Sequence, residues 1–173
     1  MYTDEPVAEH IIREMLENAN WAPNHKQTEP WRFKVFRGEA LQRLGAFLGE
    51  RYEATTPPER FSGIKQRKLS TNPAKAGALI AIILHRDPEA RLPEWEEIAA
   101  VAAAVQNMWL TATAHGLGGY WSSPNTITEH AADFLQLAEG ERCLGLFYLA
   151  HHRAPEDMPR ERGDIHAKVE WID

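Results

Sequence analysis

The side chains best suited to bind a ligand lie in one loop between two prolines. Residues 22–31 read Ala-Pro-Asn-His-Lys-Gln-Thr-Glu-Pro-Trp, so four hydrogen-bonding side chains follow one another in Asn24, His25, Lys26 and Gln27. Such a loop can hold a planar polar ligand. The alternative is a rigid connection whose polar groups face water, and the loop taken alone favours that alternative.

A second candidate segment combines glycines with hydroxyl groups. Residues 115–123 read His-Gly-Leu-Gly-Gly-Tyr-Trp-Ser-Ser, and the glycines Gly116, Gly118 and Gly119 would let a ligand approach the backbone closely. The spacing is not a dinucleotide-binding fingerprint, and the Walker lysine motif is absent as well. Because glycines after a helix mostly cap it or permit a turn, this segment alone is a weak signal.

Other reactive side chains fit known chemistries poorly. His151 and His152 are adjacent, so they would point to opposite faces of a strand, and no metal-ligand spacing occurs among the eight histidines. We therefore expect no metal site. Ser122 and Ser123 lack a Gly-x-Ser-x-Gly elbow, which leaves hydrolysis a poor third hypothesis. The single Cys143 lies in an apolar stretch, where a thiol usually packs as a small hydrophobe.

Length, composition and charge indicate one ordered domain over residues 1–173. The chain is 43% hydrophobic and 25% charged, as in globular proteins, and has no run of apolar residues long enough for a membrane span. Its formal net charge of -6 would repel phosphate backbones and anionic lipid, so neither nucleic acid nor a membrane is an expected partner. The acidic start, Met1-Tyr2-Thr3-Asp4, does not resemble a signal peptide, and a cytoplasmic location is expected.

Apolar periodicity predicts the elements that position these segments. Alternating or continuous apolar residues predict strands over residues 31–36, 78–84, 118–121 and 144–150. Helical spacing predicts helices over residues 7–19, around residues 41–48, over residues 93–115, and up to Leu135 with Thr126 or Thr128 as the cap. The least predictable stretch is Thr55 to Pro73, which is rich in Lys and Arg.

Three apolar stretches carry predictions about burial. Ala78 to Leu84 lacks alternation, which suits a central strand covered on both faces. Ile98 to Val105 is apolar throughout, so this helix should be buried in the fold or against another subunit. The terminal Val169-Glu170-Trp171-Ile172 would be costly to leave in water, and we expect it to dock on another surface, such as that of a partner subunit.

Taken together, the segments resemble the nitroreductase family, especially its compact members, over nearly the whole chain. The order and spacing of the motifs carry the resemblance: Pro6-Val7, Ala22-Pro23-Asn24-His25-Lys26, Pro30-Trp31-Arg32-Phe33, Gly116-Leu117-Gly118-Gly119-Tyr120-Trp121 and Gly145-Leu146-Phe147-Tyr148-Leu149. The resemblance implies an α+β three-layer sandwich with a mixed central sheet and flanking helices, intertwined into a homodimer. It also implies FMN at the dimer interface, with electrons passing from NAD(P)H to a nitroaromatic, quinone or similar small acceptor.

The resemblance further implies roles for individual residues. In the family, the loop after the first helix reaches the flavin, often from the opposite subunit, and the glycine-rich segment contacts flavin or nicotinamide. The residues carried over to FMN are Trp21, Asn24, His25, Lys26, Gln27, His115, Gly116, Gly118, Gly119, Trp121, Ser122 and Ser123. No side chain is expected to act as a nucleophile, because the flavin carries the chemistry.

The sequence departs from the family pattern at the flavin phosphate. Family members usually carry an Arg-Arg-Ser motif just upstream of the position of Tyr2, and compact relatives tend to have Arg where Ser122 stands. Loss of a charge-assisted phosphate contact weakens binding substantially, so a flavin-poor, non-catalytic homodimer with a ligand-binding or regulatory role is the alternative hypothesis. The cations that would compensate are Lys26, Arg32, Arg160, Arg162 and Lys168.

Overall fold

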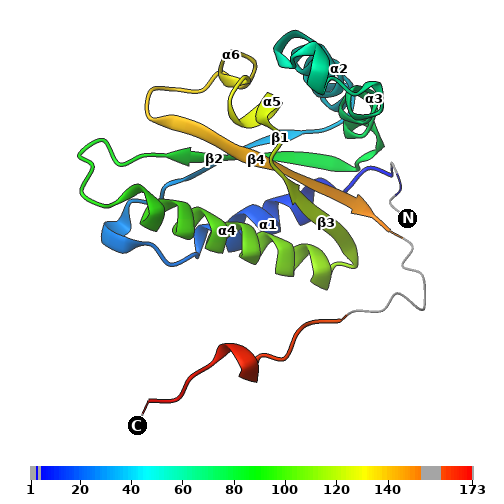
Figure 1. The fold of residues 1–173 in the computed structure, drawn as a ribbon. Coiled ribbons are helices and arrows are strands. Elements are labelled where there is room, and N and C mark those ends of the chain that lie inside the picture. Colours follow the sequence, from blue (N-terminus) through cyan, green and yellow to red (C-terminus); the bar gives the residue numbers. More distant parts are fainter. Residues whose placement is uncertain (1–2, 4, 153–160, 173) are drawn as a thin grey trace.

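A four-stranded sheet separates two layers of helices in residues 3, 5–152 and 161–172, the part of the chain that the computed structural model describes (Figure 1). The strands are β1 (Trp31–Phe36), β2 (Ala78–His85), β3 (Leu117–Ser122) and β4 (Glu141–His151), in the order β1-β2-β4-β3. The predicted α+β class and the three-layer arrangement are confirmed, and β1 and β3 form the two edges of the described sheet.

The prediction of a mixed sheet is wrong for the described strands, because every neighbouring pair is antiparallel. β2 and β3 do run parallel to each other, since the single helix α4 (Glu94–Ala114) returns the chain to the end where β2 began. They are not neighbours, however, because β4 lies between them and runs against both.

The central strand β2 supplies side chains to two cores, as its unbroken apolar sequence predicted. Ile80, Ile82 and Leu84 pack towards α1 (Glu9–Asn20) and α4, on one face of the sheet. Leu79 and Ala81 pack on the other face, towards α2 (Glu39–Thr55). Alternation along one strand therefore fills both interlayer spaces.

The first helical layer consists of α1 and α4, which are joined by side-chain hydrogen bonds. Asn18 Nδ2 donates to Thr111 Oγ1 at 2.9 Å, and Asn107 Nδ2 donates to the carbonyl oxygen of Asn18 at 3.0 Å. α4 buries only one side in this layer. Trp95 and Leu110, on its outer face, are 67% and 59% exposed.

The second layer contains α2, α3 (Gly63–Thr71) and two short helices, α5 (Asn125–Thr128) and α6 (Ala132–Leu135). The predicted single helix up to Leu135 is therefore wrong, and neither Thr126 nor Thr128 caps it. Pro124 is the residue before α5, and its fixed φ suits a helix start, so both threonines lie inside the first short helix. The unpredictable stretch between α2 and β2 holds α3 between two 3-10 turns, Pro58–Arg60 and Pro73–Lys75.

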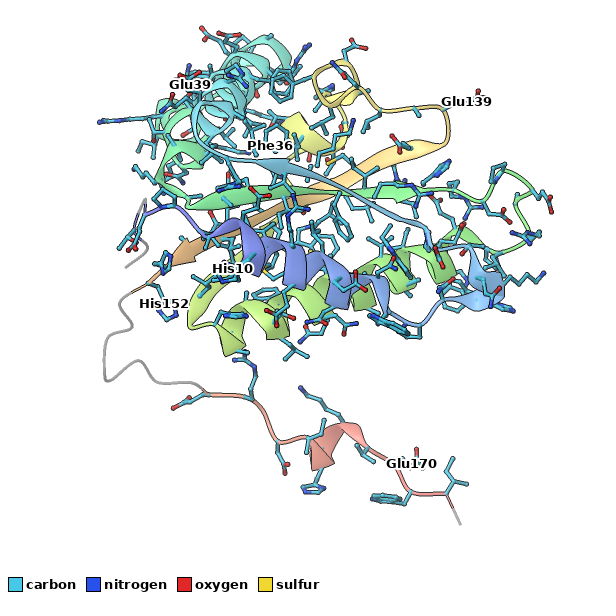
Figure 2. The ribbon with its side chains drawn as sticks, turned by 180° about the vertical axis from the view of Figure 1, so that it is seen from behind. His10, Phe36, Glu39, Glu139, His152 and Glu170 are labelled. Atoms are coloured by element: carbon cyan, nitrogen blue, oxygen red, sulfur yellow. The ribbon has the colours of Figure 1, made fainter. Side chains whose placement is uncertain are left out.

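The last described segment, residues 161–172, extends away from the two helical layers. Figure 2 shows Glu170 far from the sheet, and Trp171 beside it is 84% exposed. Its only described helical turn is His166–Lys168. Arg160, one of the cations expected to compensate at the flavin phosphate, lies outside the described residues. No helix in the described ranges has both the length and the apolar character needed to cross a bilayer.

Candidate ligand-binding site

The loop between α1 and β1 is held in a strained conformation by its own hydrogen bonds. Lys26 and Gln27, within the 3-10 turn His25–Gln27, both have φ of 54°, in the left-handed region that non-glycine residues seldom adopt. Asn24 Oδ1 accepts a hydrogen bond from the Glu29 amide at 3.0 Å. Strain of this kind concentrates where a loop has a functional role, so the loop is a reasonable place for a ligand.

Two of the loop side chains already have partners at the start of α4. His25 Nδ1 lies 2.8 Å from Glu96 Oε2, and Lys26 Nζ donates to the carbonyl oxygen of Arg91 at 3.3 Å. By contrast, the Trp21 indole is 78% exposed. These contacts fix the loop against α4 and leave Trp21 free to cover a neighbouring surface.

A cavity lies beside this loop on the outer face of α4. Its volume is about 400 Å³, and its walls are formed by Asn24 and His25 on one side and by Trp95, Ala99 and Ala103 on the other. We call it the α4 hollow. Its helical wall is apolar, so a ring or an apolar side chain would bury surface there.

The glycine-rich segment begins at the opposite end of α4. His115 Nε2 lies 2.9 Å from Glu14 Oε2, and Gly116 has φ of 70°, which ends the helix. At Gly119, an added Cβ would lie 2.6 Å from Phe147 Cζ. Packing against β4 therefore requires this glycine, whether or not a ligand is bound.

The side chains that follow in β3 point alternately to the two faces of the sheet. Trp121 packs on the core below α4, and its Nε1 donates to the carbonyl oxygen of Leu144 at 3.0 Å. Tyr120 points to the other face, while Ser123 lies at the exposed end of the strand. The Trp121 indole therefore has a structural role in packing β3 against β4.

Sequence reasoning missed a pocket on that other face, between the turn Pro73–Lys75 and strands β3 and β4. It has a volume of about 210 Å³ and is lined by Asn72, Lys75, Ala76, Tyr120, Tyr148, Leu149 and Ala150. We call it the tyrosine pocket. The two tyrosine rings stack at a centroid distance of 4.6 Å, and burial, with Tyr120 as a weaker influence, raises the pKa of Tyr148. Its hydroxyl is therefore protonated at neutral pH.

A larger recess of about 560 Å³ lies at the end of β3, between α3 and α5. We call it the α3 recess; it is lined by Tyr52, Thr55, Thr56, Pro57, Arg60, Lys65, Leu69, Ser123, Pro124, Asn125, Thr126, Glu129 and His130. Only Ser123 among these was a predicted site residue. The signal that could have revealed both pockets is the run of cations between residues 60 and 75 in an otherwise acidic chain.

The structure thus divides the predicted site residues into two groups. The loop group, with Trp21 to Gln27, lies towards the start of α4, whereas His115 and Gly116 lie at its end, and β3 then runs back from there to Ser122 (Figure 1). The 21 residues of α4, about 30 Å in length, separate His115 and Gly116 from the start of the helix. One subunit therefore does not bring the loop and the residues at the end of α4 to a single small ligand.

Thiol chemistry has no support in the structure. Burial raises the pKa of Cys143 to about 11, which keeps its thiol protonated and unreactive at neutral pH. As for metals, the described residues contain no group of three or more His, Cys, Asp and Glu side chains positioned to hold an ion.

Comparisons with known proteins agree on one family. The model of the "Nitroreductase family" matches residues 1–151. The chain is similar to "Putative NAD(P)H nitroreductase YdjA" of Escherichia coli (strain K12), with 27% identity over 140 residues. This match covers 80% of the chain and 74% of the relative. A nitroreductase-like family protein from Bacillus cereus superimposes with a TM-score of 0.79 at 30% identity, over 99% of this chain and 89% of that one. A structure from Desulfovibrio desulfuricans that holds FMN gives a TM-score of 0.70 at 27% identity, with the same coverage.

Proposed function

Because this chain belongs to the nitroreductase family, we propose that it is an FMN-dependent oxidoreductase that carries electrons from NAD(P)H to a small acceptor. The acceptor classes we propose are nitroaromatics and quinones, reduced in a ping-pong cycle in which donor and acceptor use the site in turn. The observation that carries the proposal is that residues 21–27 and residues 115–116 lie towards opposite ends of α4. Two copies of the chain would reunite them.

The outer face of α4 supports such a homodimer. Trp95, Ala99, Ala102 and Leu110 follow at helical spacing and are exposed in a single copy. Gln106 interrupts the run, and the exposed apolar side chains on either side of it are costly in water and favour association. In a twofold dimer packed on this face, antiparallel α4 helices would place the loop of one copy beside the glycine-rich segment of the other.

The tyrosine pocket, which lies beside the edge strand β3, fits an FMN ring in its chemistry. The tyrosine pocket offers the Lys75 ammonium and the Asn72 amide, and in the described part of the chain neither side chain has a hydrogen-bond or ion-pair partner. A cation and an amide donor suit the edge of a flavin that becomes negative on reduction. The pocket volume of about 210 Å³ is below the ~300–1,000 Å³ of usual ligand sites, which is consistent with a further wall from a partner copy.

Each group of residues has its own role in this proposal. When bound, FMN would accept hydride equivalents from the nicotinamide and pass electrons to the acceptor. Lys75 and Asn72 would hold the ring in place, and the Tyr148 hydroxyl, protonated at neutral pH, would remain available as a donor. The loop of the partner copy, with its exposed Trp21, would cover the ring and exclude water.

Flavin occupancy of Lys75→Ala tests this placement. We expect the purified variant to keep its fold but to retain clearly less FMN than the unchanged protein, because it loses the only cation of the tyrosine pocket. Lys34→Ala is the matched control, since Lys34 lies on the opposite edge strand and donates to the carbonyl oxygen of Gln136. If both variants lost equal amounts of FMN, the tyrosine pocket would not be part of the flavin site.

The alternative, a non-catalytic homodimer, has its own signature. Such a protein would remain colourless when purified and after incubation with FMN.

The FMN occupancy of Gln27→Ala tests the loop. Unchanged occupancy in this variant would argue against a contact between the Gln27 side chain and the flavin.

A further inference from the structure

The cations between residues 60 and 75 form an unusual cluster in this acidic protein. Five basic residues fall in this stretch, Arg60, Lys65, Arg67, Lys68 and Lys75. Within the described residues, none of the five makes an ion pair, whereas Arg86, Arg91 and Arg142 elsewhere each do. A group of unpaired cations creates a local positive potential, which attracts anionic ligands to a chain of net charge -6.

Two of these cations, Arg60 and Lys65, line the α3 recess, and Tyr52 contacts the Lys65 side chain and the backbone at Arg60. Lys65 Nζ lies 5.1 Å from the centre of the Tyr52 ring. The Tyr52 hydroxyl donates to the carbonyl oxygen of Arg60 at 3.4 Å and accepts from the Ser62 amide at 3.1 Å. Arg60 and Lys65 both line this cavity of about 560 Å³, a volume that is ordinary for a small-molecule site.

The position of Lys65 is unfavourable for the helix that carries it. It lies in the first turn of α3, where the positive end of the helix dipole repels a cation, and that turn contains no acidic residue. The first turn of α4, by contrast, contains Glu94, Glu96 and Glu97. An anion bound in the recess would offset the repulsion at α3.

A buried hydroxyl in the recess also lacks a partner. Thr126 is 3% exposed, and its Oγ1 has no hydrogen bond in the described part of the chain. Buried polar groups without partners are rare in folded proteins, and they indicate a place for water or a ligand oxygen. Ser123, which also lines the recess, directly follows β3.

We propose that the α3 recess binds the 2′-phosphate of the nicotinamide donor, so that the enzyme prefers NADPH to NADH. This inference rests on the proposed function. Arg60 would offer a guanidinium fork and Lys65 a second positive charge, the combination that phosphate groups favour. Both side chains are exposed. Exposed cations suit the phosphate of a donor that leaves after every turnover better than they suit the phosphate of a cofactor that stays bound.

Binding of 2′,5′-ADP and of 5′-AMP to the purified full-length protein tests the inference without turnover. The two nucleotides share an adenosine 5′-phosphate, and only the first has the 2′-phosphate. We expect 2′,5′-ADP to bind at least ~10-fold more tightly, and Arg60→Ala or Lys65→Ala to remove most of that difference. Arg43→Ala, an exposed arginine on α2 paired with Glu39, is the matched control.

Donor kinetics provide the second measurement. In Arg60→Ala, kcat/KM for NADPH should fall by about 10-fold while kcat/KM for NADH stays within about twofold, because NADH does not carry the group that the recess binds. Arg60→Lys should retain part of the preference. Equal affinity for the two nucleotides, or equal loss in Arg60→Ala and Arg43→Ala, would overturn the inference.

The two proposals fail in different ways. If flavin is reduced equally well by NADH and NADPH and the two nucleotides bind alike, the proposed function stands and the phosphate site is wrong. If 2′,5′-ADP binds through Arg60 but neither donor reduces a flavin, the phosphate site stands and the proposed function is wrong.

Discussion

At the scale of single residues, Gly145 controls the shape of β4 next to the candidate site. It has φ of 140° and lies where the pairing of β4 with β2 shifts register. A Cβ there would run into the Trp121 ring, whose nitrogen bonds the neighbouring Leu144 carbonyl. The glycine therefore permits both the irregular backbone and the close ring.

Substitution of Gly145 by Ala should destabilise the protein. We expect a loss of about 1–3 kcal/mol in the free energy of unfolding, from an unfavourable φ and a crowded ring. Urea denaturation measures this loss. Gly63→Ala is the control, because an added Cβ at Gly63 meets nothing within 4 Å and its φ is not positive. Equal stability of the two variants would contradict the packing described at Gly145.

Asp87 makes the stability of the connection between β2 and α4 dependent on pH. The hydrogen bond from the Arg91 side chain, at 2.7 Å, lowers the pKa of Asp87 from 3.8 to about 2. A lowered pKa stabilises the folded state above the unfolded value, so this contribution is complete above about pH 4 and is lost as the pH falls towards 2. In Asp87→Asn, the melting temperature should therefore depend less on pH between pH 4 and pH 2 than it does in the unchanged protein. An unchanged pH profile would show that the pair contributes nothing.

At the scale of elements, sequence patterns predicted the helices and strands whose buried faces follow from their own residues. The apolar run of β2 and the apolar periodicity of α1 follow from the faces that each element buries, so both could be read from the sequence. The order β1-β2-β4-β3 could not, because pairing between distant strands leaves no local trace. The mixed sheet was expected only from the family resemblance.

The residues of the candidate site likewise include some that a local pattern predicted and others that it did not. The loop residues from Asn24 to Gln27 could be predicted because prolines and polar side chains concentrate there. Asn72, Lys75 and Arg60 could not, since they lie in a stretch without periodicity and gather only when α3 packs beside the sheet. Their clustered charge was visible, but its place in the fold was not.

Glu97 ties the start of α4 to the end of β2. It is 1% exposed, accepts from the Asp87 amide at 2.9 Å and forms an ion pair with Arg86. Glu97→Ala leaves the Asp87 amide and Arg86 Nη1 without this acceptor, and removal of one partner of a buried pair costs about 3 kcal/mol. Glu94→Ala, which breaks the exposed pair with Arg142, should cost under about 1 kcal/mol. Chemical denaturation of both variants measures the difference, and equal costs would contradict the structural role of Glu97.

At the scale of the whole molecule, one copy leaves two apolar surfaces uncovered. The first is the outer face of α4, and the second is the final described segment with Trp171 and Ile172 (Figure 2). Both would be covered if two copies paired along α4 and exchanged their last segments. The same pairing would bring the loop of one copy beside the glycine-rich segment of the other.

Leu110→Asp tests whether the proposed dimer can be disrupted while the subunit stays folded. Because Leu110 is largely exposed in one copy, the substitution should leave the subunit folded while placing a charge in the proposed interface. We expect analytical ultracentrifugation to detect monomers and the FMN content to fall by about 10-fold or more, since each site would lose the partner's loop. Ile64→Asp on α3, also at an exposed apolar position, is the control and should remain dimeric. A dimeric, flavin-loaded Leu110→Asp protein would place the interface elsewhere.

The most direct test is to measure mass and visible absorption together on the purified, FMN-incubated protein as it elutes from a sizing column. We expect a single peak with the mass of two chains, one flavin per chain, and loss of the flavin band when NADPH is added without oxygen. A colourless peak with the mass of one chain would contradict it.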